Sequence, residues 1–200
     1  MAVGVEIERK FRLLAHTELW SEQGFTVLAA WEIWQGYVTP ADADPEVRVR
    51  RLREVDMTTV DAFEPQALLG SDGEPTVVRW LAVKSRIPTS DAGALSRQEI
   101  ETPIDEDFFT EAWRFCDQRR LHKIRIEYMV QLPVDGHRVI VVDHFRDHLE
   151  GLSLAEIEFG DWTASTRFDP PGFLGREVTH DERYRNARLA EADKPPPEPA

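Results

Sequence analysis

Charged side chains occupy every second position in several short segments of this 200-residue sequence. Residues two apart on a β-strand point to the same side, so each such segment would place its charges on one face. Paired carboxylates are hard oxygen ligands that suit Mg²⁺ or Mn²⁺, whereas guanidinium and ammonium groups suit phosphate oxygens. The carboxylate pairs are Glu6/Glu8, Glu99/Glu101 and Glu156/Glu158, and the cationic pairs are Arg48/Arg50 and Lys123/Arg125. The pattern is typical of a site for an oligophosphate that carries a divalent metal.

In any single strand, the same alternation would arise from an ordinary antiparallel sheet with one wet face and one buried face. Across all the segments, however, the charged face has hardly any Ser or Thr, and Lys10, Lys84 and Asp143 belong to it as well. A sheet closed into a barrel with these faces inward would form a channel of opposed charges, which needs a charged ligand to offset the desolvation. The alternation alone leaves both interpretations open.

The elements that must position these charges are mostly short strands. Eight alternating segments predict strands, and Pro133-Val134-Asp135-Gly136 between two of them predicts a hairpin turn. The predicted strands are residues 5–13, 32–38, 46–53, 77–86, 97–102, 123–132, 139–145 and 154–159. Strands of this kind favour a mainly antiparallel sheet.

Helices are fewer. Residues 105–119 carry apolar side chains at three- and four-residue spacing, which predicts a helix with one buried face. The apolar positions are Phe108, Phe109, Ala112, Phe115 and Cys116. Cys116 is therefore expected in the core rather than as a nucleophile, because no neighbouring pattern suggests an activated thiolate. A shorter helix is predicted over residues 17–23.

The C-terminal region predicts one more helix and a tail. Thr179 and Glu182 have the spacing of a capping box, in which a hydroxyl and a carboxylate satisfy backbone donors at a helix start, so a helix is expected over about residues 180–190. The proline-rich residues 191–200 cannot sustain helix or ladder bonding, and we expect them to be disordered. The chain then divides into one compact domain, residues 1–190, and a tail. Residues 54–75 are predicted to form a long acidic loop.

The composition limits the expected partners. A formal net charge of −13 would repel nucleic acid or an anionic membrane over most of the surface. The longest apolar stretches are far shorter than the roughly 20 residues that span a bilayer. The single cysteine cannot form an intrachain disulfide. We expect a cytoplasmic protein that acts on a small molecule, with a homodimer left open.

Three further signals have a structural explanation beside a functional one. His144 and His148 have a metal-like spacing, but they follow a predicted strand, so surface or supporting roles are favoured over zinc binding. Trp31 and Trp34 could stack on a nucleobase, although packing within the sheet is favoured. Glu177 could reach the binding channel, or it could stabilise the start of the last helix through the helix dipole, which is slightly favoured.

The charged segments also resemble, in order along the chain, the motifs of the CYTH family, the triphosphate tunnel metalloenzymes. The opening Glu6-Ile7-Glu8-Arg9-Lys10 looks like the family signature Glu-x-Glu-x-Lys, which by itself is a weak motif. A full set of matching segments in family order is specific, and the resemblance covers residues 5 to about 190. The other segments are Gln35-Gly36-Tyr37, residues 47–50, Lys84, residues 97–101, Lys123-Ile124-Arg125, Asp143, residues 154–158 and residues 175–179, with Tyr184 and Asn186 beyond.

The resemblance implies a predominantly antiparallel α+β fold, in which eight strands form a closed β-tunnel with a few flanking helices and a C-terminal helix. It also implies that basic residues hold a triphosphate and that acidic residues bind two metal ions, Mg²⁺ or Mn²⁺. By matching motif, the substrate ligands would be Lys10, Arg48, Arg50, Lys84, Lys123 and Arg125. The metal ligands would be Glu6, Glu8, Glu158, Glu156 and Asp143. The catalytic set around the attacking water would be Glu156, Glu99 and Glu101, together with Lys10.

The implied activity is hydrolysis of a linear triphosphate. Inorganic tripolyphosphate is the expected substrate, because the resemblance is closest to short bacterial members and nothing in the sequence demands base recognition. A class IV-type adenylyl cyclase and a thiamine or nucleoside triphosphatase are alternatives within the enzyme class. A non-catalytic polyphosphate-binding module is a further alternative, which the many carboxylates disfavour because simple anion binding gains nothing from them.

Overall fold

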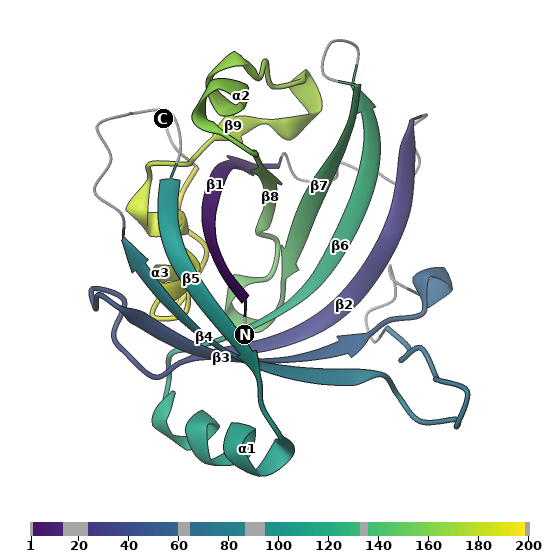
Figure 1. The fold of residues 1–200 in the computed structure, drawn as a ribbon, viewed down its shortest axis with the longest axis vertical. Helices are drawn as coiled ribbons and strands as arrows, with labels where there is room; N and C mark the ends of the chain where they lie inside the picture. Colours follow the sequence, from purple (N-terminus) through teal and green to yellow (C-terminus); the bar gives the residue numbers. More distant parts are fainter. Residues whose placement is uncertain (1, 14–23, 60–64, 87–94, 133–135, 199–200) are drawn as a thin grey trace.

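A strongly curved antiparallel sheet forms most of the protein in the computed structural model (Figure 1). The structure describes residues 2–13, 24–59, 65–86, 95–132 and 136–198, with the backbone alone at residues 2–6, 86 and 95–97. The strands are β1 (Ala2–Arg12), β2 (Phe25–Tyr37), β3 (Glu46–Glu54), β4 (Val77–Arg86), β5 (Leu95–Pro103), β6 (Arg120–Leu132), β7 (Gly136–Phe145), β8 (Ser153–Glu158) and β9 (Arg176–Glu177). The α-helices are α1 (Glu106–Phe115), α2 (Trp162–Arg167) and α3 (Asn186–Leu189). The 3₁₀ helices are η2 (Met57–Thr59), η3 (Asp147–Leu149), η4 (Gly172–Leu174) and η5 (Glu182–Tyr184).

The order of the strands runs round into a ring. It is β5-β4-β3-β2-β6-β7-β8-β1-β9, and β1 pairs with β5 as well as with β8. The first half of β1 pairs with β5, from Ala2 opposite Glu101 to Glu8 opposite Leu95. The second half pairs with β8, beginning at Glu8 opposite Glu158. Because every one of these pairings is antiparallel, the result is the antiparallel β-tunnel that the resemblance implies, with β9 as a short addition beside β1.

All eight predicted strands are present, and the prediction over residues 77–86 coincides with β4. The largest difference is at β2, which begins at Phe25 rather than at residue 32. The pairing register of β2 with β6 shifts between Val27 and Ala29, which marks a β-bulge. The positions that pack against the largest buried cluster therefore change from odd numbers, at Phe25 and Val27, to an even number at Ala30, and a search for strict alternation misses the first half of β2.

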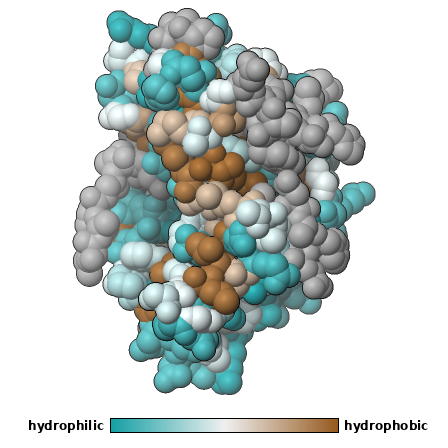
Figure 2. Space-filling view, turned by 90° about the vertical axis from the view of Figure 1, so that its right-hand side faces the viewer, coloured by the Kyte–Doolittle hydropathy of each residue, from teal (hydrophilic) through white to brown (hydrophobic). Residues whose placement is uncertain are grey.

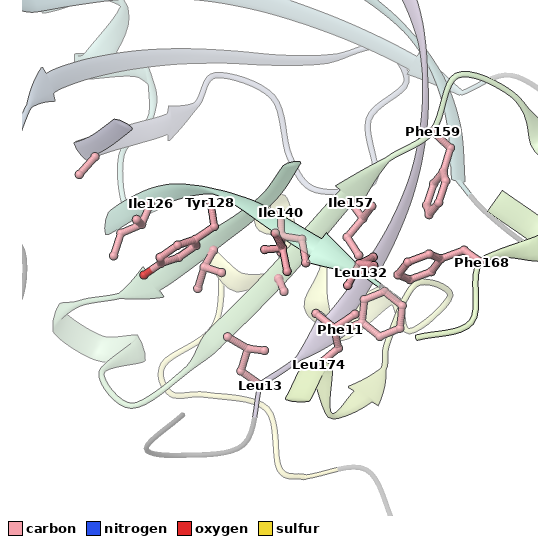
Figure 3. Close-up of a cluster of buried hydrophobic side chains, with 14 of the residues drawn as sticks. Phe11, Leu13, Ile126, Tyr128, Leu132, Ile140, Ile157, Phe159, Phe168 and Leu174 are labelled. Carbon is pink, nitrogen blue, oxygen red and sulfur yellow. The ribbon is translucent and has the colours of Figure 1, made fainter. Parts of the chain in front are cut away.

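The two faces of the sheet have opposite characters, as the alternation predicts. Apolar side chains on one face form the largest buried cluster, which includes Phe11, Tyr128 and Ile157 (Figure 3). Phe168 and Leu174, from the segment that follows β8, cover this cluster. The rings of Phe11 and Phe168 meet edge to face, with centroids 6.4 Å apart. The largest apolar cluster thus lies between the sheet and the C-terminal segment. The opposite face carries the charges, and at one end it contributes Tyr37, Phe145 and Leu154 to a second apolar cluster.

Helix α1 is shorter than predicted and buries fewer side chains. Asp105 caps its start by accepting a hydrogen bond from the backbone N–H of Phe108 at 2.8 Å. Phe109 and Cys116 are buried against β3, as expected. Phe108 and Phe115, which were expected on the same buried face, are 48% and 68% exposed. The contact of α1 with the barrel is therefore narrower than its apolar content suggests.

The predicted C-terminal helix over about residues 180–190 is present only in part. The 3₁₀ helix η5 and the short α3 stand in its place, separated by the extended backbone of Arg185 at φ −68° and ψ 134°. Asp181 caps η5, since its carboxylate accepts a hydrogen bond from the N–H of Arg183 at 3.1 Å. The hydroxyl of Thr179 binds β1 instead of forming a capping box with Glu182.

The proline-rich segment, for which the sequence predicts disorder, contacts the barrel over the part that the structure describes, residues 191–198. Arg12 donates a hydrogen bond to the carbonyl of Pro196 at 2.8 Å, and the Tyr184 hydroxyl donates one to the carbonyl of Pro197 at 3.1 Å. Pro196 is buried. The division of the chain into a domain and a separate tail stays a prediction.

Two other predictions, the helix over residues 17–23 and the turn at residues 133–135, lie outside the described residues. The strands on either side of that turn do pair, with Leu132 opposite Gly136. The predicted loop over residues 54–75 contains η2 and two isolated bridges in its described part, Val55 with Ala67 and Leu69 with Pro75.

Some large apolar side chains remain at the surface. Leu28, Leu69 and Val139 are 45%, 58% and 41% exposed. On the side of the molecule that lies to the right in Figure 1, apolar side chains gather along the middle of the face (Figure 2). Exposed apolar atoms are normal in folded proteins, because polar groups cannot cover a whole surface. Within the described residues, no helix is long and apolar enough to cross a membrane.

Candidate active site

The predicted site residues come together on the inner face of the ring. Val49 of β3 packs against Phe109 and Cys116 of α1, which lies outside the barrel (Figure 1). The neighbouring Arg48 and Arg50 therefore point away from α1, into the barrel. Their side chains contact carboxylates from β5, and a matching group of charges lies on β1, β6, β7 and β8.

The first group of charges joins β3, β4 and β5. Glu99 accepts a hydrogen bond from Arg48 at 2.8 Å and lies 3.0 Å from the Nζ of Lys84. Glu101 pairs with Arg50 and lies 3.5 Å from Arg48. Lys84 and Glu99 are directly opposite each other on β4 and β5. The strand register thus sets three predicted phosphate ligands beside two predicted catalytic carboxylates.

The second group joins β1, β6, β7 and β8. Asp143 accepts hydrogen bonds from Arg125 at 2.7 and 2.8 Å and from the Nζ of Lys123 at 2.5 Å. Glu156 lies 2.9 Å from the Nζ of Lys10 and accepts a hydrogen bond from Arg125 at 3.1 Å. Arg125 therefore bridges two carboxylates. The second group places the other three predicted phosphate ligands together.

The two groups adjoin across β2. Burial, and after it the positive charges of Arg48 and Arg125, lower the pKa of Arg50 to about 10, so the charge of Arg125 in the second group is felt at Arg50 in the first. Burial lowers the pKa of Lys123 to about 8, and this effect outweighs the nearby charge of Asp143. The charged forms of Arg50 and Lys123 are therefore less favourable than usual, and added negative charge beside them, such as a phosphate, would stabilise them.

The carboxylates in both groups are held in their ionised form. Burial acts to raise the pKa of Glu101, but the charges of Arg50 and Arg48 outweigh it and the pKa is lowered. Burial also opposes ionisation of Glu156, yet Lys10 and Arg125 hold the pKa of its carboxyl well below its ordinary value. The pKa of Asp143 is lowered in the same way by Arg125 and Lys123. These carboxylates can therefore accept hydrogen bonds from a water molecule at neutral pH.

The predicted metal ligands are only partly assembled among the described side chains. No group of three or more His, Cys, Asp or Glu within the described residues is arranged to hold a metal ion. Glu8 and Glu158 are directly opposite on β1 and β8, and Glu6 lies two residues before Glu8, with its side chain outside the description. Like charges at directly opposite positions destabilise a sheet, and two facing carboxylates are hard oxygen donors. This pair therefore fits a divalent cation, whereas Asp143 and Glu156 each contact two cationic side chains.

One end of the charged face has an ion pair that the sequence predictions missed. Glu46 of β3 and Arg185, between η5 and α3, lie 3.3 Å apart, and each side chain is 6% exposed. Glu46 is opposite Lys84 in the β3–β4 register. Its position two residues before Arg48 could have identified it as an inward-facing charge. Arg185 carries no such signal, because it lies outside any strand.

The backbone of Lys10 is fixed by the segment after β9. The Thr179 hydroxyl accepts a hydrogen bond from the N–H of Lys10 at 3.0 Å and donates one to Glu177 at 2.6 Å. Glu177 in turn accepts a hydrogen bond from Arg9 at 2.9 Å. Glu177 therefore supports β1, rather than reaching the tunnel or stabilising the start of a helix. These contacts were not predicted, since they join residues far apart in the sequence.

Three of the remaining signals have structural roles. Trp34 stacks on His122 on the outer face, with ring centroids 5.3 Å apart, which favours packing over base recognition in the tunnel. The Nδ1 of His144 lies 2.9 Å from the hydroxyl of Ser153 on β8. Burial raises the pKa of the Cys116 thiol to about 11, so this side chain is a core residue and not an activated nucleophile.

The fold and the site together define a class of protein, an antiparallel β-tunnel lined by opposed cations and carboxylates, as in the CYTH or triphosphate tunnel type. The chain is 30% identical over 188 residues to an inorganic triphosphatase of Acetivibrio thermocellus, and the match covers 94% of each protein. It is 44% identical over 98 residues to an inorganic triphosphatase of Nitrosomonas europaea, which is 49% of this chain and 62% of that protein. The crystal structure of the inorganic triphosphatase NE1496 matches 94% of this chain and 95% of that one, with a TM-score of 0.55 and 29% identity. No family model matches the chain.

This protein belongs to the inorganic triphosphatase family.

Proposed function

We propose that this protein hydrolyses a linear triphosphate inside its tunnel, with inorganic tripolyphosphate as the preferred substrate. The observation that carries the proposal is the set of six cations on one inner face, each within ion-pair distance of a carboxylate from another strand. The cations are Lys10, Arg48, Arg50, Lys84, Lys123 and Arg125. The relatives named above as inorganic triphosphatases support the same activity.

To bind the substrate, the cations would exchange their carboxylate partners for phosphate oxygens. Arg125 now divides its guanidinium between Asp143 and Glu156, and phosphate oxygens offer it the same bidentate geometry. Because the phosphate chain extends over several groups, it can contact the cations of both charged groups at once. Such fixed positive charges stabilise the negative charge that spreads over the phosphoryl oxygens during transfer. The cations would therefore favour the transition state as well as binding.

The carboxylates would position the attacking water. Glu99, Glu101 and Glu156 lie beside the cations, and the pKa values of Glu101 and Glu156 are lowered. An ionised carboxylate can accept a hydrogen bond from water and orient it for in-line attack on the terminal phosphorus. Substituting each of the three by Gln and measuring kcat identifies the carboxylate that orients the water.

The metal would be Mg²⁺ or Mn²⁺, held by Glu8 and Glu158 with Glu6. Glu156 and Asp143 each contact two cationic side chains, so they would serve a second ion only once those cations bind the substrate instead. When bound, a divalent ion neutralises phosphate charge and polarises the bond that breaks. The facing carboxylates of Glu8 and Glu158 support this assignment.

A cytoplasmic location stays a prediction, as does the absence of nucleic-acid and membrane partners.

The proposal is tested by measuring phosphate release from tripolyphosphate, ATP and thiamine triphosphate, each with Mg²⁺, Mn²⁺ or EDTA. We expect metal-dependent turnover with the highest kcat/KM on tripolyphosphate, and pyrophosphate and phosphate as products. Formation of cyclic AMP from ATP would point to the adenylyl cyclase alternative. Preference for thiamine triphosphate or ATP would correct the substrate, and tight tripolyphosphate binding without turnover would indicate a binding module.

A further inference from the structure

We propose that the outside of the barrel carries a second binding site, for a planar aromatic molecule that bears an anionic group. The site is a cavity of about 380 Å³ between α1 and strands β2 and β3. Its walls include three aromatic rings and two guanidinium groups, completed by a carboxylate and a hydroxyl. The lining residues are Trp34, Phe109, Trp113, Arg51, Arg114, Glu106 and Thr110. None of them belongs to the charged inner face described above.

The aromatic walls of the outer cavity are held in place before any ligand binds. Phe109 and Trp113 of α1 stack with centroids 5.3 Å apart, and Arg120 covers Trp113 at 4.7 Å. Trp34 stacks almost parallel on His122, with an interplanar angle of 7°. Rings that are fixed in this way lose little conformational entropy when a planar molecule binds against them.

The approach of α1 to the sheet depends on a glycine next to the cavity. A Cβ atom at Gly36 would lie 2.9 Å from a ring carbon of Trp113 and 2.6 Å from the Sγ of Cys116. Gly36 is two residues after Trp34 on β2, so the two residues share the outer face. The small residue therefore lets α1 bring Trp113 close to β2, and Trp113 and Trp34 both line the cavity.

Arg51 supplies an uncompensated positive charge in the cavity. It lies between Trp34 of β2 and Arg79 of β4 in the strand register, so its nearest cross-strand neighbours are a ring and a like charge. The carboxylate of Glu106 forms an ion pair with Arg79 and not with Arg51. Arg51 makes no hydrogen bond or ion pair to the described residues; its guanidinium lies 5.3 Å from the Trp34 ring, and its Nε is buried without a partner.

These features together specify the chemistry of the ligand. Indole walls whose faces already carry other side chains can still bind a flat ring by edge-to-face or offset contact, and a half-buried guanidinium beside them binds a carboxylate or phosphate on that ring. The volume lies near the lower end of the roughly 300–1,000 Å³ typical of small-molecule sites. A nucleoside monophosphate and a small aromatic acid share this chemistry, and they serve as separate probes.

The test is isothermal titration calorimetry of the intact protein with AMP and with 4-hydroxybenzoate, beside adenosine and ribose 5-phosphate. We expect at least one of the first two to bind more tightly than adenosine, which lacks the anion, and ribose 5-phosphate, which lacks the ring. Trp34→Leu and Arg51→Gln should each weaken that binding by about tenfold, the effect of losing one stacking or charge contact. Arg167→Gln, an exposed position on α2, is the matched control and should bind as the wild type does.

The outer site and the tunnel are distinguished by repeating the titration with excess pyrophosphate and Mg²⁺, which should fill the tunnel. Binding that persists under these conditions supports the outer site, and binding that pyrophosphate displaces assigns the ligand to the tunnel and overturns the proposal. Absence of binding by both probes, or equal binding by the wild type and the two cavity variants, also overturns it. Trp34→Leu and Arg51→Gln should keep wild-type tripolyphosphatase activity, which shows that each variant is folded.

Discussion

The Nζ of Lys123 lies 2.5 Å from the Oδ2 of Asp143, and the two side chains are only 1% and 2% exposed. Burial nevertheless lowers the pKa of Lys123 to about 8, because the charge of Asp143 does not fully offset the loss of solvent and Arg125 adds repulsion. A lysine in this state is a cation whose charge depends on what occupies the tunnel.

The titration of Lys123 can be observed directly. The sequence contains four lysines, Lys10, Lys84, Lys123 and Lys194, so ¹³C-lysine NMR gives few signals. We expect the Lys123 signal to titrate near pH 8 in the ligand-free protein and to move to higher pH when pyrophosphate and Mg²⁺ bind. Titration close to 10.5, the ordinary lysine range, would contradict the assigned environment.

The same pKa predicts how stability responds to pH. The unfolded chain keeps the Lys123 proton up to a pKa of about 10.5, whereas the folded protein releases it near 8. Between these values the unfolded state binds more protons, so the Lys123 contribution makes the fold more stable as pH rises. Urea denaturation of the wild type and of Lys123→Met at pH 7.5 and 9.5 measures this contribution. We expect the free energy of unfolding to rise less with pH in Lys123→Met than in the wild type. An equal rise in both proteins would contradict the lowered pKa of Lys123.

Removal of Asp143 should destabilise the fold strongly. Asp143→Ala leaves Lys123 and Arg125 buried beside each other without the carboxylate that both contact. Breaking a buried ion pair by removing one partner costs roughly 3–5 kcal/mol. Urea denaturation should show a loss of this size, and Asp169→Ala, at an exposed position, should change stability by less than about 0.5 kcal/mol. A loss below about 1 kcal/mol for Asp143→Ala would show that the pair is hydrated rather than buried.

The facing carboxylates of Glu8 and Glu158 predict a metal-dependent stability. Glu8→Gln removes a like-charge contact, so the metal-free protein should gain about 0.2–1 kcal/mol. The wild type should gain stability when Mg²⁺ is added, and Glu8→Gln should gain much less, because one ligand is lost. Thermal melting in EDTA and in Mg²⁺ measures both effects. Equal Mg²⁺ responses in the two proteins would remove Glu8 from the metal site.

The contact of Thr179 with β1 predicts a positioning role. Thr179→Val keeps the shape of the side chain but leaves the N–H of Lys10 without its acceptor at a buried position. We expect a stability loss of about 1–3 kcal/mol and a lower kcat/KM on tripolyphosphate, with both recovered in Thr179→Ser. Thr163→Val, at an exposed position of α2, is the control. If Thr179→Val lost stability but kept full kcat/KM, the role of Thr179 would be structural only.

Much of the fold could be predicted because the alternation of charged and apolar residues is strong. Arg48 and Arg50 lie on one face and Val49 on the other, and the structure confirms this arrangement. The closed ring came from the family resemblance, since period-two patterns do not say whether a sheet closes. The first half of β2 was missed because the bulge between Val27 and Ala29 moves the positions that face the largest apolar cluster from odd to even numbers.

The contacts that could not be predicted join segments far apart in the chain. Thr179 has the local spacing of a helix cap, yet its hydroxyl binds Lys10, and the tertiary contact prevails over the local preference. Arg185 interrupts the predicted last helix, and its side chain pairs with Glu46 at one end of the charged face. Both cases reflect the same cause, because a buried polar group takes the partner that the tertiary structure provides.

The central claim is that the inner cations act on tripolyphosphate together with a divalent metal, and one measurement tests it most directly. It is the initial rate of phosphate release from tripolyphosphate by the wild type and by Arg50→Gln, each with Mg²⁺ and with EDTA. The prediction is turnover that EDTA abolishes and a kcat/KM about 10²-fold lower in folded Arg50→Gln, the loss typical of removing one group that stabilises transition-state charge. Turnover that continues in EDTA, or an Arg50→Gln variant as active as the wild type, would contradict the account.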